Sequence, residues 1–131
     1  MRAILIDAAK REVKEVTIDA DKNVLHQWYD LLNCQLVETG HYINEHDSIL
    51  VDEEGLLKGF VKTYFHYNGA HQPFAGSGLV VGVDEMGRTV DCNITLEEVT
   101  ENVMFLTEDA LYAYYYTDEQ EERNHTEGSF D

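Results

Sequence analysis

Basic residues are scarce in this chain. Its 131 residues include 9 Lys and Arg against 26 Asp and Glu, which gives a net charge of −17. Proteins that bind nucleic-acid phosphates or anionic membranes need a basic face. The composition therefore argues against direct binding to nucleic acid or to a membrane, and it favours a partner that is itself basic.

Long apolar runs and cysteine motifs are also missing. The first apolar run, residues 3–6, ends at Asp7 and is too short for a secretory signal, and no run approaches the roughly 20 residues of a membrane span. Cys34 and Cys92 form no C-x-x-C motif, so buried thiols in a reducing compartment are their simplest interpretation. We therefore expect a cytoplasmic protein.

Motifs for metal binding and catalysis are absent too. The histidine pairs His41/His46 and His66/His71 are each five residues apart, which is not a spacing that anchors zinc. Residues 52–55 (D-E-E-G) lack the alternating carboxylates and the distal glutamate of a calcium loop. Neither cysteine belongs to a catalytic signature. We expect no catalytic residue, no metal and no cofactor.

What is present suffices for one domain, because 44% of the residues are apolar and only one proline interrupts the chain. Apolar runs predict strands at residues 3–6, 48–51 and 79–83, and a further strand is expected around Val13, Val16 and Ile18. The motif V-D-E-x-G at 51–55 and 83–87 predicts a hairpin turn at each place.

Helices are predicted at two places. The apolar spacing in residues 19–33 predicts one helix, with Asp19 or Asp21 as its N-cap and Asn33 at its end, followed by a strand over residues 34–39 and a polar loop over 40–46. The capping box Thr95-Leu96-Glu97-Glu98 predicts a second helix over residues 96–102.

Three other segments are less regular. Residues 103–106 are the end of the second helix or a last strand, and residues 110–116 fit either a helix or a strand. Residues 60–78 show no period and are expected to form a long excursion over the sheet, with at most one helical turn.

Together these elements predict an α+β fold. We expect a single domain over residues 1–117, in which a mixed, mostly antiparallel sheet carries two helices packed on one face. Residues 118–131 form an acidic C-terminal tail that is expected to fray.

Three segments carry a family likeness: residues 1–7 (MRAILID), residues 49–59 (ILVDEEGLLKG) and the G-x-G-L-V-V-G of residues 76–82. Over roughly residues 1–100 the chain resembles the small-protein family with the domain of unknown function numbered 3846. That family usually continues with a stretch containing Pro and Asn, whereas residues 60–68 here are aromatic. The resemblance implies a fold and a phage, plasmid or bacterial mobile-element context, and it brings no catalytic residues.

Negative charge is concentrated at the C-terminal end. Residues 1–83 hold 7 basic and 12 acidic residues, whereas residues 84–131 hold 2 basic and 14 acidic ones. One interpretation is a solvated surface and tail that keep the protein soluble. The other is an acidic surface for a basic partner, which the neighbouring tyrosines favour because tyrosine is common at interfaces.

Our main hypothesis is a non-enzymatic accessory protein of a phage or mobile element that binds another protein, without binding nucleic acid directly. In its sharpest form the protein is a DNA mimic or an inhibitor of a host nucleic-acid-handling or defence protein, acting in the host cell cytoplasm. The predicted partner-binding residues are Glu97, Glu98, Glu101, Glu108, Asp109, Tyr112, Tyr114, Tyr115 and Tyr116.

Two alternatives remain open. In the first, the protein is a small-molecule-binding protein or an enzyme that uses loop 60–78, with Tyr64, His66 and His71 forming a pocket. In the second, it is a self-assembling structural protein, a homo-oligomer whose copies contact one another through the tyrosines of residues 112–116.

Overall fold

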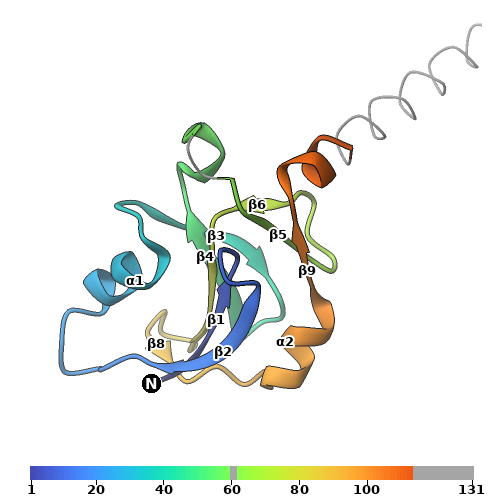
Figure 1. Ribbon diagram of the computed structural model, residues 1–131. Helices are drawn as coiled ribbons and strands as arrows, with labels where there is room; N and C mark the ends of the chain where they lie inside the picture. Colours follow the sequence, from blue (N-terminus) through green and yellow to red (C-terminus); the bar gives the residue numbers. More distant parts are fainter. Residues whose placement is uncertain (60–61, 114–131) are drawn as a thin grey trace, which may run out of the picture.

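The computed structural model describes residues 1–59 and 62–113, whose strands form two sheets (Figure 1). The first sheet has the order β2-β1-β7-β4-β3, with β8 beside β7, and the second has the order β6-β5-β9. The strands are β1 (Arg2–Asp7), β2 (Glu12–Thr17), β3 (Val37–Tyr42), β4 (Asp47–Asp52), β5 (Tyr64–Tyr67), β6 (Phe74–Ala75), β7 (Gly78–Val83), β8 (Thr89–Val90) and β9 (Val103–Leu106). All pairings between these strands are antiparallel.

The central strands of the first sheet are buried on both faces. In β1, Ile4 and Ile6 face one core, while Ala3 and Leu5 face the other. The alternation follows from the pleat of the strand, in which successive side chains point to opposite faces. Strands covered on both sides are apolar at nearly every position, which is why β1, β4 and β7 appear in the sequence as continuous apolar runs.

One core lies between the two sheets. It is built from residues of both, among them Ile4, Ile49, Phe65, Phe74 and Val80. The sheets approach closely at Gly78, where a Cβ atom would stand 2.6 Å from Cζ of Phe65. Glycine is therefore required at this position of β7 by the aromatic ring of the facing sheet.

The helices lie on opposite faces of the first sheet (Figure 1). Leu32 of α1 (Val24–Leu32) is buried in the core away from the second sheet, and Val99 of α2 (Leu96–Asn102) is buried in the core between the sheets. The predicted α+β class and the mostly antiparallel pairing are confirmed. The predicted packing of both helices on one face is wrong, because strands that are apolar on both faces need a cover on each.

The local predictions for α2 are confirmed in detail. The helix occupies residues 96–102, and the Thr95 side chain accepts the Glu98 backbone N–H at 3.1 Å. The following residues form β9, so the strand alternative for 103–106 is correct. The turn after β7 is also as predicted, with Gly87 at φ +79°. A positive φ of this size favours glycine over residues with a Cβ atom.

Around α1 the predictions were partly wrong. The N-cap is Asn23, whose side chain accepts the His26 backbone N–H at 3.1 Å, whereas Asp19 accepts the N–H of Asp21 in the turn before the helix. The predicted end at Asn33 is confirmed by its left-handed conformation, with φ 52°. The strand expected at residues 34–39 begins only at Val37 and extends into the predicted polar loop.

The prediction of an irregular excursion over residues 60–78 is also wrong. This segment contains β5 and β6, which form the second sheet with β9. The expected hairpin at 52–55 does not form, because the chain leaves the first sheet at the end of β4, passes through the 3₁₀ helix η1 (Gly55–Leu57) and enters the second sheet. Residues 108–113 are helical, which resolves part of the ambiguous segment. Tyr114, Tyr115 and Tyr116 lie outside the described residues, as does the predicted tail 118–131.

The helices of the described ranges are short. Among them, none combines the length and the apolar composition needed to cross a membrane.

Candidate functional site

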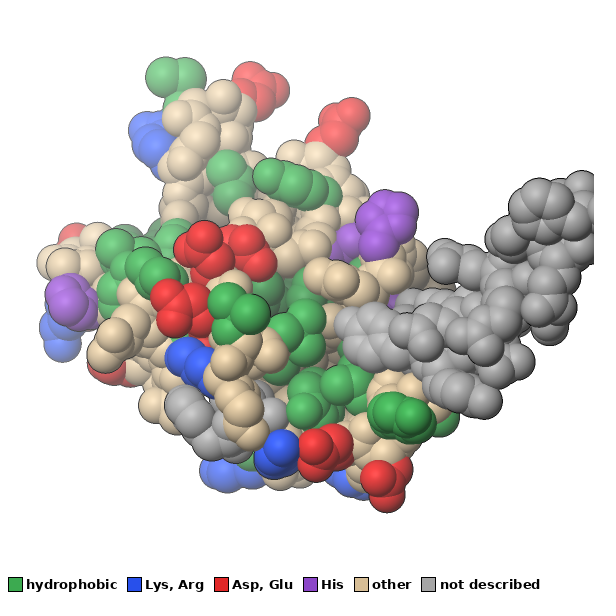
Figure 2. Space-filling view, turned by 90° about the horizontal axis from the view of Figure 1, so that it is seen from above, with side chains coloured by type: hydrophobic (Ala, Val, Ile, Leu, Met, Phe, Trp, Pro, Cys, Tyr) green, Lys and Arg blue, Asp and Glu red, His purple; other side chains and the backbone are tan. Residues whose placement is uncertain are grey.

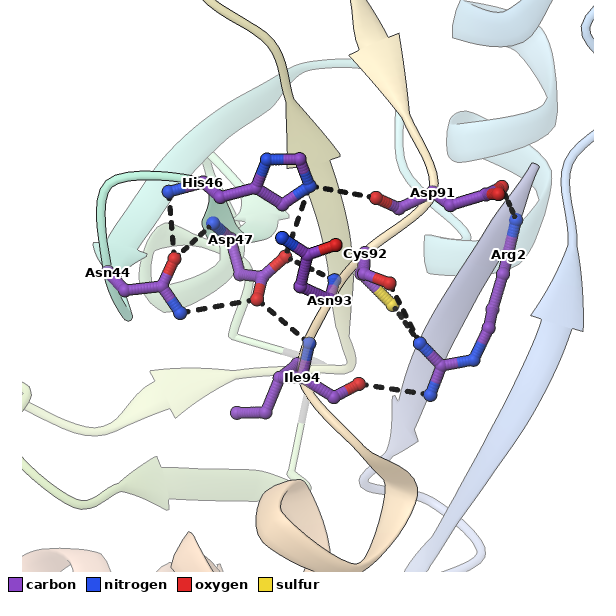
Figure 3. A network of polar contacts seen from close by, with 8 residues as sticks. All are labelled: Arg2, Asn44, His46, Asp47, Asp91, Cys92, Asn93 and Ile94. Carbon is purple, nitrogen blue, oxygen red and sulfur yellow. Dashed lines mark hydrogen bonds and ion pairs between the residues drawn. The ribbon is translucent and has the colours of Figure 1, made fainter.

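The segment that leads from β8 into α2 is anchored by a buried carboxylate (Figure 3). Asp47, the first residue of β4, is fully buried. Its carboxylate accepts the backbone N–H groups of Asn93 at 2.8 Å and Ile94 at 2.9 Å, and the side-chain amide of Asn44 at 3.2 Å. Because a buried carboxylate without partners is costly, these three donors make the position of the segment specific.

Arg2 holds the same segment from the other side (Figure 3). Its backbone N–H donates to the carboxylate of Asp91 at 2.7 Å. Its guanidinium donates to the carbonyls of Cys92 at 2.8 Å and Ile94 at 2.9 Å. The Arg2 guanidinium also donates to the Glu15 carboxylate, which raises the pKa of Arg2. A further contact to the segment comes from His46, whose Nε2 lies 2.9 Å from the Asp91 carbonyl oxygen. The start of α2 is thus tied to β1 and β4.

The predicted glutamates of α2 are exposed on this anchored helix. Glu97 and Glu98 lie in its first turn, where a negative charge interacts favourably with the helix dipole. The Thr95 hydroxyl also lies 3.4 Å from the Glu98 carboxylate. Glu101 is exposed near the other end of the helix. The helix dipole therefore offsets part of the charge repulsion for Glu97 and Glu98, but not for Glu101.

The end of α2 is fixed to the second sheet. The Asn68 backbone N–H donates to the Asn102 carbonyl at 2.9 Å, and the two side-chain amides are joined at 3.1 Å. From there the chain passes directly into β9, where Met104 is 62% exposed. A hollow of about 240 Å³ borders this junction and is lined by His66, Asn68, Glu101, Asn102, Val103 and Met104.

The second group of predicted residues follows β9. Glu108, Asp109 and Tyr112 are exposed in the helical segment 108–113, and Glu108 pairs with Lys62 at 3.0 Å. Both partners of this pair are more than half exposed, so the pair adds little stability.

α2 and segment 108–113 lie at the two ends of β9 (Figure 1), so the predicted carboxylates form two groups that β9 separates. Because β9 has four residues, these groups are separated by about 13 Å of strand.

Carboxylates lie among exposed apolar side chains on the end of the molecule that carries η1 and residues 108–113 (Figure 2). The exposed apolar residues include Leu57, which is 85% exposed, and Tyr112, which is 72% exposed. Protein interfaces combine an apolar core, in which aromatic residues are enriched, with a polar rim.

The residues of the alternative pocket are only partly brought together. Tyr64 is a buried residue of β5, and His66 follows on the same face of that strand, where its Nε2 lies 3.0 Å from the Ala70 carbonyl. His66 and His71 both lower the pKa of His41, after the larger effect of burial. A histidine from β3 thus joins two of the predicted residues. Nowhere in the described ranges do three or more His, Cys, Asp or Glu side chains converge as metal ligands would.

Both cysteines are free and buried. Burial raises the pKa of the Cys34 and Cys92 thiols, and for Cys92 the nearby charge of Arg2 opposes that effect. The sulfur of Cys92 also lies 3.2 Å from the Arg2 guanidinium, but a thiol whose pKa is raised by burial remains a poor nucleophile. Their surroundings are therefore those of structural thiols.

The anchoring residues Arg2, Asn44 and Asp47 were missed by the sequence analysis. A weak signal was available, because Asn44 and Asp47 stand three positions apart just before an apolar strand, a spacing that suits a side-chain-capped turn. Asn44 does accept the backbone N–H of Asp47, at 2.7 Å. Nothing in the local sequence, however, indicates that the Asp47 carboxylate accepts the backbone N–H groups of Asn93 and Ile94, which lie 46 and 47 positions further along the chain.

The sequence model of the domain of unknown function DUF3846 matches residues 1–104. The chain belongs to this family. The matched region extends from β1 into β9, so it includes Glu97, Glu98 and Glu101 and leaves out Glu108, Asp109 and Tyr112. No curated protein and no solved structure matches the chain.

Proposed function

We propose that this DUF3846 protein binds a basic protein partner through its acidic surface, which consists of Glu97, Glu98, Glu101, Glu108 and Asp109 together with Tyr112. One observation carries the proposal. Residues 89–113 contain six acidic residues, all of them exposed, and no Lys, Arg or His. Such a stretch attracts cationic surfaces and repels anionic ones.

The rigidity of the support adds to the argument. The carboxylates of α2 stand on a helix that Asp47 and Arg2 hold at its start and Asn68 holds at its end. Charges that are fixed before binding lose little conformational entropy when the partner arrives.

The partner class follows from the charge. Proteins that handle nucleic acids present basic grooves to phosphates, and an array of carboxylates can take the place of those phosphates. In the phage or mobile-element setting, the partner is then a nucleic-acid-handling or defence protein of the host, and the protein acts as a DNA mimic in the host cytoplasm without an enzymatic activity of its own.

The test is a pull-down of the tagged protein from a host-type lysate at low and at high salt. We expect one or a few basic nucleic-acid-handling proteins to be retained at about 50 mM salt and lost at about 500 mM, because screening weakens contacts between exposed charges. Absence of such a protein at both salt concentrations would contradict the proposal.

The histidine group favours a second candidate function, the binding of a small anion near loop 60–78. His71 and His66 both lower the pKa of His41, after the larger effect of burial, and an anion bound beside His41 would offset their repulsion. Titration calorimetry with inorganic phosphate at pH 5.5 and pH 7.5 tests this function. Binding at pH 5.5 that His71→Asn abolishes supports it, and no binding at either pH refutes it.

A further inference from the structure

β9 is the outer strand of the second sheet. Within the described ranges it pairs with β5 on one side and with no strand on the other. The hydrogen bond from the Asn68 N–H to the Asn102 carbonyl shows which residues of β5 and β9 exchange backbone hydrogen bonds, because bonded and non-bonded pairs alternate along an antiparallel ladder. His66 and Met104 are then a bonded pair. The backbone N–H and C=O of Phe105 therefore point away from β5, outward from the open edge of β9.

The pattern on the far side of β5 agrees with this assignment. Gly76 donates its N–H to the Thr63 carbonyl at 2.8 Å, so Phe65 bonds toward β6 rather than toward β9. Phe65 is the residue opposite Phe105. Both observations thus give the same direction for the backbone of Phe105.

The edge of β9 also lacks the usual protection against a further strand. Edge strands are normally blunted by charged side chains, bulges or very short length. Among the other outer strands of the described part, β2 carries Glu12, Lys14 and Glu15, and β3 has a register shift between Thr39 and His41. The strands β6 and β8 are each two residues long. β9 is Val-Met-Phe-Leu in a regular register.

Charge decides what fits this edge. Glu97, Glu98 and Glu101 precede β9, and Glu108 and Asp109 follow it. A second copy of the chain would bring the same carboxylates together, and residues 118–131 of this chain carry six acidic residues and one basic residue. Like charges at such short range repel. A cationic extended segment is the occupant that both ends of the strand attract.

We propose that an extended, basic segment of the partner protein adds to β9 as a further strand of the second sheet. Its backbone bonds to the N–H and C=O of Phe105, and its Lys or Arg side chains reach the carboxylates at the two ends of β9. One such side chain enters the hollow beside Met104, whose lining includes Glu101. This mode of binding rests on the proposed function and specifies it, since strand addition takes affinity from the main chain and specificity from alternate side chains.

The test uses two probe peptides of equal charge with the complete protein. One is a ten-residue peptide of alternating Lys and Val, and the other replaces alternate Val residues with Pro, which cannot continue a strand. We expect the first peptide to bind at least tenfold more tightly at about 50 mM salt. At saturation, NMR should show at least tenfold slower hydrogen exchange for the Phe105 amide, and a smaller effect for Met104, which already bonds to β5.

A backbone variant isolates the interaction from side-chain packing. Phenyllactic acid incorporated at position 105 replaces the N–H by an ester oxygen and keeps the aromatic ring. We expect the Lys-Val peptide to bind at least fivefold more weakly to this variant. The matched control is the leucic-acid ester at Leu25, which lies in α1 on the other face of the first sheet, and we expect its affinity to be unchanged.

The outcomes separate the two proposals. Equal binding of both peptides without protection of Phe105 would overturn strand addition while leaving the acidic surface as the binding site. Binding of neither peptide would overturn both proposals. A Phe105 amide already protected in the free protein would mean that another segment of this chain occupies the edge, which also overturns strand addition.

Discussion

The carboxylate of Asp47 accepts the backbone N–H of Ile94 at 2.9 Å, although the two residues are 47 positions apart. Asp47 begins β4 and Ile94 comes just before the cap of α2. This bond therefore connects the core of the first sheet to the helix that carries the predicted glutamates. The position of the acidic surface depends on a polar contact that is itself buried.

Replacement of Asp47 by Asn should lower the free energy of unfolding by about 1–3 kcal/mol, because the amide keeps one acceptor and leaves one buried N–H without its partner. Urea denaturation followed by circular dichroism measures the change. Asp30→Asn, on the exposed face of α1, serves as the control and should change the stability by less than about 0.5 kcal/mol. Equal stability of the two variants would remove the anchoring role of Asp47.

The cap of α2 can be tested within one helix. Thr95→Ala removes the acceptor of the Glu98 N–H and should cost about 1 kcal/mol. Thr100, in the interior of α2, donates its hydroxyl to the Leu96 carbonyl, so Thr100→Ala should be neutral or slightly stabilising, given the higher helix propensity of alanine. Thermal unfolding of both variants gives the comparison, and a loss at position 100 equal to that at 95 would contradict it.

His41 should make the stability depend on pH. Its pKa in the folded protein is lowered from the ordinary value of 6.5, first by burial and then by His71 and His66. Below pH 6.5 the unfolded chain thus binds more protons at this residue than the folded one. The contribution of neutral His41 to the free energy of unfolding is therefore fully present above pH 6.5, and it is lost as the pH falls through the pKa of His41 in the folded protein.

The variant His41→Gln isolates this effect from the carboxylates, which titrate in both proteins. Urea denaturation between pH 5 and pH 8 should show the wild type losing more stability than the variant as the pH falls below 6.5. The difference between the two proteins should be constant above about pH 7.5. Parallel curves over the whole range would contradict the lowered pKa of His41.

The thiols should be slow to react in the folded protein. Cys34 and Cys92 are buried, and burial raises the pKa of both. With the disulfide reagent of a colorimetric thiol assay, we expect at least tenfold slower modification at pH 8 in buffer than in about 8 M urea. Rapid reaction of either thiol under native conditions would show that its site is accessible.

The sequence is most informative where structure is determined by neighbouring residues. The cap at Thr95, the end of α1 at Asn33 and the turn at Gly87 each depend on contacts within a few residues. All three were predicted correctly. The buried strands β1, β4 and β7 were also found, because each contains a continuous apolar run that is bounded by polar turns.

Apart from the N-cap of α1, the start of β3 and the turn after β4, the errors concern contacts between distant segments. β5 pairs with β6 and β9, and Tyr64 and Phe65 on its two faces are both buried, so no polar–apolar alternation marks it as a strand. The placement of α1 and α2 on opposite faces likewise depends on which strands are central. Asp47 looks like any carboxylate beside a strand until Asn93 and Ile94 are brought to it.

The candidate site was predictable in its charge and not in its shape. Glu97, Glu98, Glu101, Glu108 and Asp109 are exposed, as expected both for a solubilising surface and for a partner-binding one. That a strand divides them into two groups was one of two alternatives for residues 103–106, and the pairing of β9 with β5 decides for it.

A matched pair of triple variants distinguishes a binding surface from a solubilising one. Glu97→Gln, Glu98→Gln and Glu101→Gln together neutralise α2, and glutamine at position 98 keeps the side chain that suits the cap. Glu12→Gln, Glu38→Gln and Glu45→Gln change the net charge equally at exposed positions of other elements. In pull-downs at about 50 mM salt, we expect the α2 variant to retain less than a tenth of the basic partner, and the control to retain most of it. Equal retention by both variants would contradict a binding role for α2.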